Sequence, residues 1–506
     1  MEKRLLPEFA PWSPEAPPQP AASRAEPALG PFAALWAEGG LDALLLLGLI
    51  AGLAWAPFWL GGNRLPAWGV NGLYFPGLVL LFELGVLFAG RGHPVSIATI
   101  AGPAALFGAT LLWIVFQASP IAPLAHPIWG MASQMLEQTL EGGVSVDRGQ
   151  TLVALLRLTT AASVFWLALQ LSRRALRAHL LLEAVAVIIA AYAAYGLVLS
   201  AFFSAAIPFF DAPAQGLFVR STFVNRNNFA TYAGLGLMTT LALIVPLADR
   251  DAPTRPGSRA YRLAKRIEAA GLRGWLLLAA GFVIFVALLG TVSRGGILAA
   301  MLGACALLAV AHARGRRRGE SAGAIALVLA GLGATILFFG DLIVGRLLAS
   351  GLDDGSRLAV FSITLRAILD TPLLGYGYGV FADVFPLYRD RSIPTEDIWD
   401  KAHNAYLEVF LGLGLVFGTA LVGALVWLAA KCFIGAASRR RAPAPAAAAA
   451  ACSLLVGVHA LVDFGVQIEA VALTFMAILG AGVAQAESSR RCLSDRPRGR
   501  ERNIRC

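Results

Sequence analysis

The sequence predicts an all-α integral membrane protein with about twelve transmembrane helices and one large polar loop late in the chain. Hydrophobic residues make up 58% of the 506 residues and charged residues only 14%, whereas about a quarter of an ordinary soluble domain is charged. Apolar runs long enough to cross a bilayer, roughly 17–25 residues each, recur along the chain. A backbone surrounded by lipid must satisfy its own hydrogen bonds, so these runs are expected to be helices.

The apolar runs divide the chain into five parts. The first forty residues contain eight prolines and lack the charged start and apolar core of a signal peptide, so we expect a disordered cytoplasmic tail at 1–40. Nine runs form a membrane bundle at 41–340, a polar loop or lid follows at 341–404, three runs occupy 405–485, and a basic cytoplasmic tail occupies 486–506. The predicted spans lie near 41–60, 68–90, 95–118, 151–171, 180–204, 229–248, 275–292, 295–312, 322–340, 405–430, 447–466 and 469–485.

Basic residues are divided unequally between the two faces of the predicted bundle. With a cytoplasmic N-terminus, 29 Lys and Arg residues fall on the cytoplasmic side, 11 fall on the opposite side and Arg157 lies within a span. Because basic residues concentrate on the cytoplasmic side, we expect both termini in the cytoplasm and the late polar loop outside. The net charge of +10 is therefore mostly a topology signal and gives no support to nucleic-acid binding. The five cysteines show no disulfide or zinc-ligand spacing.

A polar stretch at 219–232 leads into the sixth predicted span. Asn225 and the two asparagines that follow Arg226 are candidate caps for the helix start. Backbone N–H groups at a helix start attract anions, and Arg220 and Arg226 stand beside this one. The stretch therefore indicates a site for a phosphate-bearing ligand. Contact between these arginines and lipid head groups is the alternative.

Almost no sequence joins the seventh and eighth predicted spans. The turn Ser293-Arg294-Gly295-Gly296 must reverse the chain at the outer surface, and its glycines allow the positive φ values that a tight turn needs. Two helices hold Arg294 at that surface, so little of its freedom remains to be lost when it binds a ligand. Arg294 is therefore a second candidate phosphate ligand.

The late polar loop is predicted to contain an amphipathic helix. At about 355–371 apolar side chains recur at spacings of 3, 4 and 3, at Leu358, Phe361, Leu365 and Ile368. A helix with one apolar face and several charged side chains typically lies on the bundle or at the interface. We expect this helix to act as a lid.

Three further polar side chains are candidates for binding the substrate, in addition to Arg226 and Asn225. Arg357 lies in the predicted lid helix, and Tyr388 lies later in the loop. Arg157 is about two turns into the fourth span. There it either reaches the outer surface with its long side chain or points into an outward-facing cavity.

His403 is the only histidine of the polar loop, and it immediately precedes the tenth span. An imidazole takes up a proton near neutral pH, so His403 is a candidate general base. A lone histidine is more often structural. His459 and Asp463 lie four residues apart on the eleventh predicted span, so one helix face would offer an imidazole and a carboxylate that orient a partner.

The order of these motifs resembles the O-antigen ligase and polysaccharide polymerase family. The similarity covers roughly residues 40 to 485, and its motifs are Arg220-Ser-Thr-Phe-Val-Asn-Arg-Asn, Ser293-Arg-Gly-Gly, Gly355-Ser-Arg with Pro372-Leu-Leu-Gly-Tyr-Gly, and His403-Asn-Ala-Tyr-Leu-Glu with Gly412-Leu-Gly-Leu. The family often has proline in an Asn-Pro-Asn run where this chain has Asn225-Arg226-Asn227. The resemblance implies a GT-C-like glycosyltransferase of the bacterial inner membrane, with its active site on the periplasmic face.

The resemblance also implies the reaction and the roles of the residues. A glycan linked to undecaprenyl diphosphate would be joined to an acceptor hydroxyl, on lipid A core or a similar glycan, in the biosynthesis of lipopolysaccharide or another surface polysaccharide. Arg220 and Arg294 would hold the diphosphate, and His403 would deprotonate the acceptor. Acidic residues of the loop are scattered without metal-ligand spacing, so we expect no metal and no other cofactor.

Two alternatives remain open. A polymerase of the same family differs from a ligase only in its acceptor, which would be another lipid-linked glycan. A membrane transporter would need paired charges near mid-membrane and an internal repeat. Glu83, a carboxyl inside the second span, favours the transporter but equally suits a neutral group hydrogen-bonded between helices.

Overall fold

The computed structural model describes residues 39–120, 122–203, 207, 218–250, 259–313, 353–394, 396, 398–439 and 443–486. Within these residues the chain forms helices and turns and no strand. The predicted terminal tails lie almost entirely outside the described residues. The ninth predicted span, at 322–340, and the first part of the polar loop also lie outside them.

Eleven of the twelve predicted spans each coincide with one helix. Eight helices of the described part are long and apolar enough to cross a membrane, so the predicted all-α polytopic membrane fold is confirmed. The apolar helices α2 and α15 are shorter, with 16 residues each. The helices are α2 Gly40–Trp55, α3 Leu65–Phe88, α4 Ala101–Ala118, α5 Ile128–Leu136, α6 Arg148–Leu171, α7 Ala175–Phe202, α8 Arg226–Arg250, α9 Arg259–Gly290, α10 Arg294–Ala313, α12 Asp353–Asp370, α13 Phe381–Tyr388, α14 Ala405–Ser438, α15 Ala444–His459 and α16 Glu469–Ala486.

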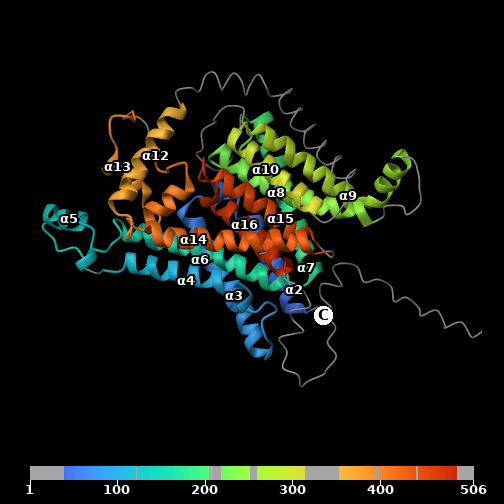
Figure 1. Ribbon diagram of the computed structural model, residues 1–506, viewed down its shortest axis with the longest axis horizontal. Helices are drawn as coiled ribbons and strands as arrows, with labels where there is room; N and C mark the ends of the chain where they lie inside the picture. Colours follow the sequence, from blue (N-terminus) through green and yellow to red (C-terminus); the bar gives the residue numbers. More distant parts are fainter. Residues whose placement is uncertain are drawn as a thin grey trace, which may run out of the picture.

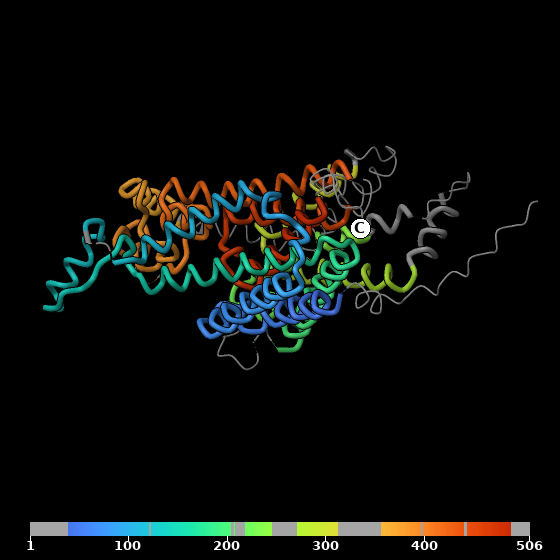
Figure 2. The backbone as a smooth tube through the Cα atoms, turned by 90° about the horizontal axis from the view of Figure 1, so that it is seen from below, coloured from blue at the N-terminus to red at the C-terminus, as the bar shows by residue number. Residues whose placement is uncertain are grey.

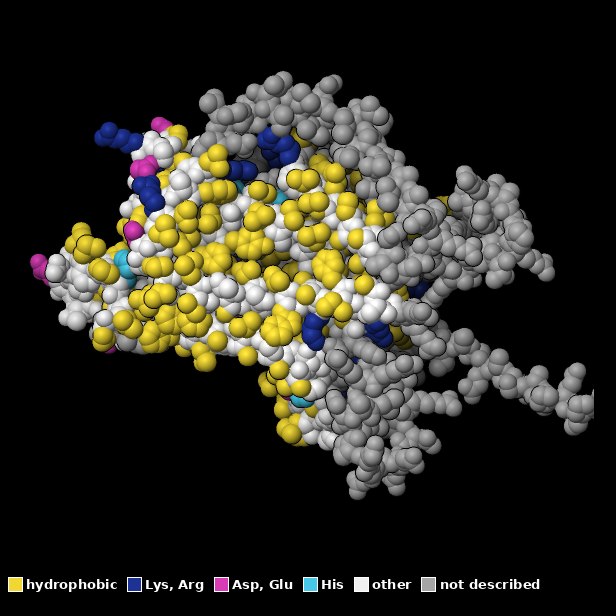
Figure 3. All heavy atoms as spheres, viewed as in Figure 1, with side chains coloured by type: hydrophobic (Ala, Val, Ile, Leu, Met, Phe, Trp, Pro, Cys, Tyr) yellow, Lys and Arg dark blue, Asp and Glu magenta, His cyan; other side chains and the backbone are white. Residues whose placement is uncertain are grey.

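Hydrophobic side chains cover the middle of the molecular face in Figure 3, and charged side chains lie toward its edges. Large exposed hydrophobic residues occur on several helices, among them Leu73 on α3 and Leu112 on α4. A soluble protein rarely exposes so wide an apolar surface. This surface is the one expected of a bundle surrounded by lipid.

The central helix of the bundle is α16 (Figure 1). It packs against α6, α14 and α15, and nearly all of its side chains are buried. A β-carbon added at Gly480 would lie 2.5 Å from the Phe165 carbonyl oxygen, and one at Gly482 would clash with the Ala449 side chain. Small residues therefore let α16 approach α6 and α15 closely, as is common where membrane helices pack.

One end of the bundle carries α12 and α13, with α5 nearby, and we call it the loop end (Figures 1 and 2). Here α14 begins beside the end of α15, because the Ala405 amide donates to the Ala460 carbonyl at 2.9 Å. The starts of α8 and α10 lie here too. His459 at the end of α15 contacts Thr231 near the start of α8 and Gly295 at the start of α10.

A glycine-rich segment at 374–379 attaches α12 and α13 to the bundle. The Gly377 amide donates to the Gly412 carbonyl at 3.1 Å, and the Gln117 side chain donates to the same carbonyl at 2.8 Å. That carbonyl lies where α14 is interrupted at Gly414, which has φ of 72°. This interruption explains the need for glycine at 414, because other residues rarely adopt a positive φ.

The predicted apolar face of α12 is wrong in part, because only Ile368 of its four residues is buried. Val360, Ile363 and Ala367 are buried, whereas Leu358 is 66% exposed and Leu365 is 48% exposed. The helix itself is present and ends two residues before the predicted proline stop. Both of its faces carry apolar side chains, so their spacing does not reveal which face meets α13 and α14.

The Glu83 carboxylate is hydrogen-bonded between helices. The Trp166 indole donates to it at 2.7 Å, and the His93 imidazole lies 2.7 Å from its other oxygen. These contacts favour the structural interpretation of Glu83 over a transport role.

Candidate functional site

Three helix starts at the loop end carry the three residues predicted to be catalytic. Arg220 lies six residues before α8, Arg294 is the first residue of α10, and His403 lies two residues before α14. Each turn contains a non-glycine residue with positive φ, namely Ser221 at 52°, Val292 at 51° and His403 itself at 54°. This conformation costs a residue with a β-carbon about 1–2 kcal/mol. Backbone strain of this kind is found preferentially at functional sites.

Arg220 is almost fully buried, with 2% of its surface exposed. Its guanidinium donates to the Val224 carbonyl at 3.4 Å, and burial lowers the pKa of this guanidinium. The Val219 amide donates to the Gly290 carbonyl at 2.9 Å. This bond ties the turn before α8 to the end of α9, and hence to the turn that carries Arg294.

Asn225 caps α8, as predicted, because its side-chain oxygen accepts a hydrogen bond from the Asn227 amide at 2.8 Å. Arg226 is therefore the first residue of the helix, the position at which proline is favoured. Arginine, where the family that the sequence resembles often has proline, thus leaves the helix start intact. The Arg226 guanidinium lies 4.3 Å from the centre of the Phe218 ring, a cation–π contact.

The predicted tight turn before α10 is confirmed, since three residues separate α9 from α10. Ser293 caps α10 by accepting from the Gly296 amide at 3.2 Å. Arg294 is exposed. A β-carbon at Gly295 would lie 3.2 Å from His459 Nε2, so the backbone of this turn lies directly against the imidazole.

His403 is held between two aromatic rings. Its imidazole meets the Trp399 ring edge to face at 5.5 Å between centres and the Phe464 ring at 5.0 Å. The following residue, Asn404, caps α14 by accepting from two amides, that of Leu407 at 3.1 Å among them. The cap fixes the backbone beside His403, and the rings fix the imidazole.

The segment 459–464 joins the three helix starts. His459 Nδ1 lies 2.7 Å from the Thr231 hydroxyl on α8. Asp463 accepts a hydrogen bond from the Asn227 side chain, also on α8. Since Phe464 contacts His403, this one segment links the turns before α8, α10 and α14.

The eleventh predicted span, 447–466, is too long. α15 ends at His459, and the chain turns over the next three residues, so His459 and Asp463 do not share a helix face. Leu461 and Val462 prolong the apolar run beyond the helix, but they are exposed in the turn. His459 and Asp463 still lie near one another, because each bonds a side chain of α8, Thr231 and Asn227 respectively.

Asp463 is buried, with 1% of its surface exposed. Burial raises the pKa of its carboxyl to about 6, against the opposing effects of hydrogen bonds from the Phe464 amide and the Asn227 side chain and of the positive charge on Arg357. Arg357, on α12, therefore lies within electrostatic reach of the segment that joins the helix starts.

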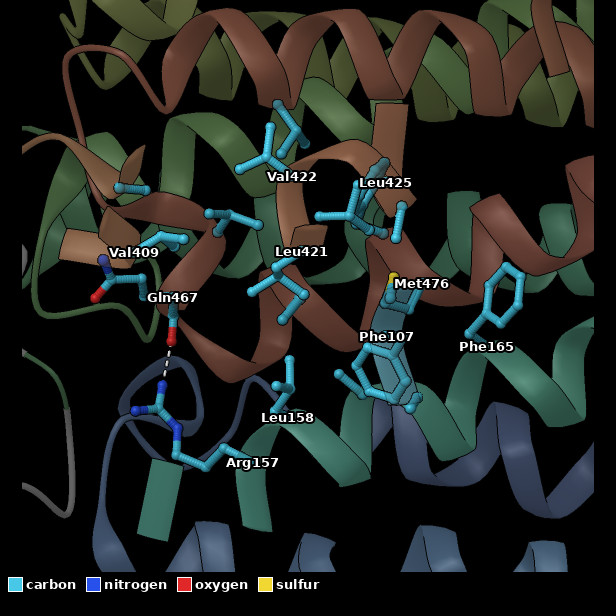
Figure 4. A pocket seen from close by; sticks show the side chains of 18 of the residues that line it. Phe107, Arg157, Leu158, Phe165, Val409, Leu421, Val422, Leu425, Gln467 and Met476 are labelled. Atoms are coloured by element: carbon cyan, nitrogen blue, oxygen red, sulfur yellow. Dashed lines mark hydrogen bonds between the residues drawn. The ribbon is translucent and has the colours of Figure 1, made fainter. Parts of the chain in front are cut away.

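Two predicted binding residues lie elsewhere at the loop end. The Tyr388 hydroxyl donates to the Asp370 carboxylate at 2.8 Å and is bonded to the Tyr376 hydroxyl, within the packing of α12 and α13. Arg157 points into a separate cavity, one of its two predicted positions, and its guanidinium donates to the Gln467 carbonyl (Figure 4).

Sequence reasoning missed Thr231 and Phe464, the contacts of His459 and His403. Thr231 lies within the polar stretch at 219–232, and Phe464 follows Asp463. Neither threonine nor phenylalanine by itself indicates a functional site in a sequence. His459 and Thr231 are 228 positions apart. The sequence around either residue gives no sign of the contact between them.

Residues 279–423 match a family model described as O-antigen ligase. The match includes Arg294, Arg357 and His403 and leaves out Arg220 and His459. It supports the family assignment drawn from the sequence, and with it an enzyme of the general ligase or polymerase type. A search among curated proteins found no match.

Proposed function

We propose that this member of the O-antigen ligase family transfers a glycan from undecaprenyl diphosphate to an acceptor hydroxyl. The acceptor is lipid A core or another lipid-linked glycan. The reaction takes place at the loop end of the bundle, on the periplasmic face of a bacterial inner membrane, with both termini in the cytoplasm. No metal takes part in this scheme.

The convergence of three helix starts at the loop end is the observation that carries the proposal. The positive ends of the helix dipoles of α8, α10 and α14 lie at this end, where they stabilise negative charge. Arg220 and Arg294 stand on two of the turns, and His403 stands on the third. Each turn is pinned by a side-chain cap on its helix, so the groups are ordered before a ligand arrives.

The proposed step is a displacement at the anomeric carbon of the donor glycan. The acceptor oxygen forms the new bond to that carbon, and its proton passes to the His403 imidazole. The bond between the anomeric carbon and the diphosphate oxygen breaks, and its electron pair leaves with the diphosphate. Arg220 and Arg294 stabilise the charge that develops on this leaving group.

A strain lacking the protein tests the function in the cell. We expect long surface glycans to be lost, because transfer from the carrier stops. A missing ligase leaves long chains on the carrier lipid, whereas a missing polymerase leaves single repeat units on the core. Both are read by electrophoresis of surface glycans and mass spectrometry of lipid-linked intermediates. Unchanged surface glycans with no change in lipid-linked species would contradict the proposal.

Fusions to alkaline phosphatase test the proposed orientation. The enzyme is active only outside the cytoplasm, so a fusion within 383–400 should be active and a fusion after residue 317 should be silent. The expectation rests on the 29 to 11 division of basic residues. The reverse pattern would place the loop end in the cytoplasm and remove the periplasmic site.

A further inference from the structure

A cavity of about 540 Å³ lies between α4, α6, α14, α15 and α16. α15 separates it from the turns that carry Arg220 and Arg294. One face of α15 meets α8, since the Cys452 thiol donates to a carbonyl of α8 and His459 bonds Thr231. Its other face lines the cavity through Ser453 and Gly457. The cavity and the arginine-bearing turns therefore lie on opposite sides of α15.

The cavity has one polar end and a long apolar remainder. Arg157 and Gln467 lie together at one end in Figure 4, and apolar side chains such as Leu421, Leu425 and Phe165 follow along the rest. This polarity is that of a lipid, with a head group at one end and a hydrocarbon chain beyond it.

The polar end of the cavity contains buried polar atoms that a ligand could bind. Arg157 Nε and Glu469 Oε1 are buried, and neither has a hydrogen-bond partner among the residues that the structure describes. Lys401 and Glu408 line the same end, since Glu408 bonds the Gln467 side chain and feels the positive charge of Lys401. Two cationic side chains and two carboxylic ones suit a head group that carries both phosphate and sugar hydroxyls, because buried polar atoms are normally paired.

The length of the cavity indicates the kind of chain. Its lining on α6, an unbroken helix, extends from Gln150 to Trp166, which is roughly 24 Å at about 1.5 Å per residue. The hydrocarbon core of a bilayer is about 30 Å thick, so an acyl chain confined to one leaflet reaches only about half of it. A single long chain fills such a cavity, whereas the several acyl chains of lipid A do not.

We propose that this cavity holds the isoprenoid chain of the acceptor, and that the acceptor is a second polyprenyl-linked glycan. The inference rests on the proposed function, in which Arg220 and Arg294 hold the donor. Lys401 and Ala405, which line the cavity, flank His403 in the chain. The head group of a lipid in the cavity therefore emerges beside His403, on the side away from α8 and α10. The reaction is then a polymerisation, and the product remains on the acceptor's carrier.

Neighbouring alanines of α4 provide a matched pair of variants. Ala104 lines the cavity, whereas Ala105 is exposed and does not line it. Ala104→Trp places an indole where the chain would lie, and displacing even two methylene groups weakens binding by about tenfold. Ala105→Trp adds the same group to the lipid-facing surface.

The experiment uses the full-length protein in nanodiscs. One glycan is supplied as acceptor on a full-length polyprenyl diphosphate, on a two-isoprene analogue and on lipid A core. We expect Ala104→Trp to raise KM for the long-chain acceptor by about tenfold, and to leave the short analogue unaffected. Ala105→Trp should behave as wild type. A polyprenyl phosphate with a diazirine at its chain end should label α14 near Leu425 in the wild type and in Ala105→Trp, but not in Ala104→Trp.

Each outcome has a definite meaning. Equal use of lipid A core and the long-chain acceptor, or equal KM values for the two alanine variants, would overturn the inference while transfer itself survives. Labelling by a phospholipid with a diazirine on its acyl chain, in place of the polyprenyl probe, would also overturn it. Labelling of the cavity by the polyprenyl probe without transfer to any acceptor would instead remove the proposed function and leave a chain-binding site.

Discussion

His403→Ala is expected to lower the rate of glycan transfer by about 10²–10⁴-fold, the usual contribution of a general base. The variant should still insert and fold, because Asn404 and not His403 caps α14. Initial rates of the purified variant with a polyprenyl-linked donor give the measurement. Gel filtration in detergent verifies that equal amounts of intact protein are compared.

Variants of two other histidines serve as controls for this result. His459→Ala should cause a smaller loss, because the His459 imidazole bonds Thr231 and supports the site without carrying a proton in the reaction. His126→Ala should change the rate little, since His126 lies at the loop end against the Tyr376 ring, 5.6 Å between centres. Near-normal transfer by His403→Ala would eliminate the proposed general base.

Replacing Arg220 or Arg294 by lysine should lower turnover by at least about tenfold although the charge is kept. A guanidinium grips two phosphate oxygens at once, whereas an ammonium acts as a point charge. The double variant should be worse than either single one. Arg64→Lys is the matched control, because Arg64 is exposed at the same end and donates only to the neighbouring Asn63 carbonyl in the described structure. Turnover equal to wild type in both single variants would contradict the clamp.

The two arginines differ in how their variants must be checked. Arg294 is exposed, so Arg294→Lys reports on turnover with little effect on folding. Arg220 is buried, so the thermal unfolding midpoint of Arg220→Lys must be measured beside its turnover. The wild-type enzyme should keep its activity in excess EDTA if arginines alone neutralise the diphosphate. Loss of activity on chelation, restored by magnesium or calcium, would assign that role to a cation.

The membrane fold could be predicted because its determinants are local. Apolar runs of the right length predicted a helix at each of eleven spans, and the residues around Ser293 predicted the tight turn between α9 and α10. The end of α15 could not be predicted from the apolar run, because it depends on contacts with a distant helix. Leu461 and Val462 extend an apolar run, but the chain turns there because His459 and Asp463 bond to α8.

The site could be predicted in part. Arg220, Arg294 and His403 stand beside helix starts, and polar residues before apolar runs are visible in a sequence. The left-handed backbone of His403 and the contact of Phe464 with its imidazole depend on packing between distant segments. The buried face of α12 depends likewise on α13 and α14. The cavity beside Arg157 is built from five helices, so no single stretch reveals it.

The central claim is that a glycan moves from a polyprenyl diphosphate to an acceptor hydroxyl at the loop end. The most direct measurement incubates the purified full-length protein with a labelled polyprenyl-diphosphate glycan and a lipid-linked acceptor. It counts both the polyprenyl diphosphate released and the glycosidic bonds formed. The account predicts one released diphosphate for each new bond, with both products lost together in His403→Ala. Failure of the wild-type protein to form the bond, or bond formation undiminished in His403→Ala, would contradict it.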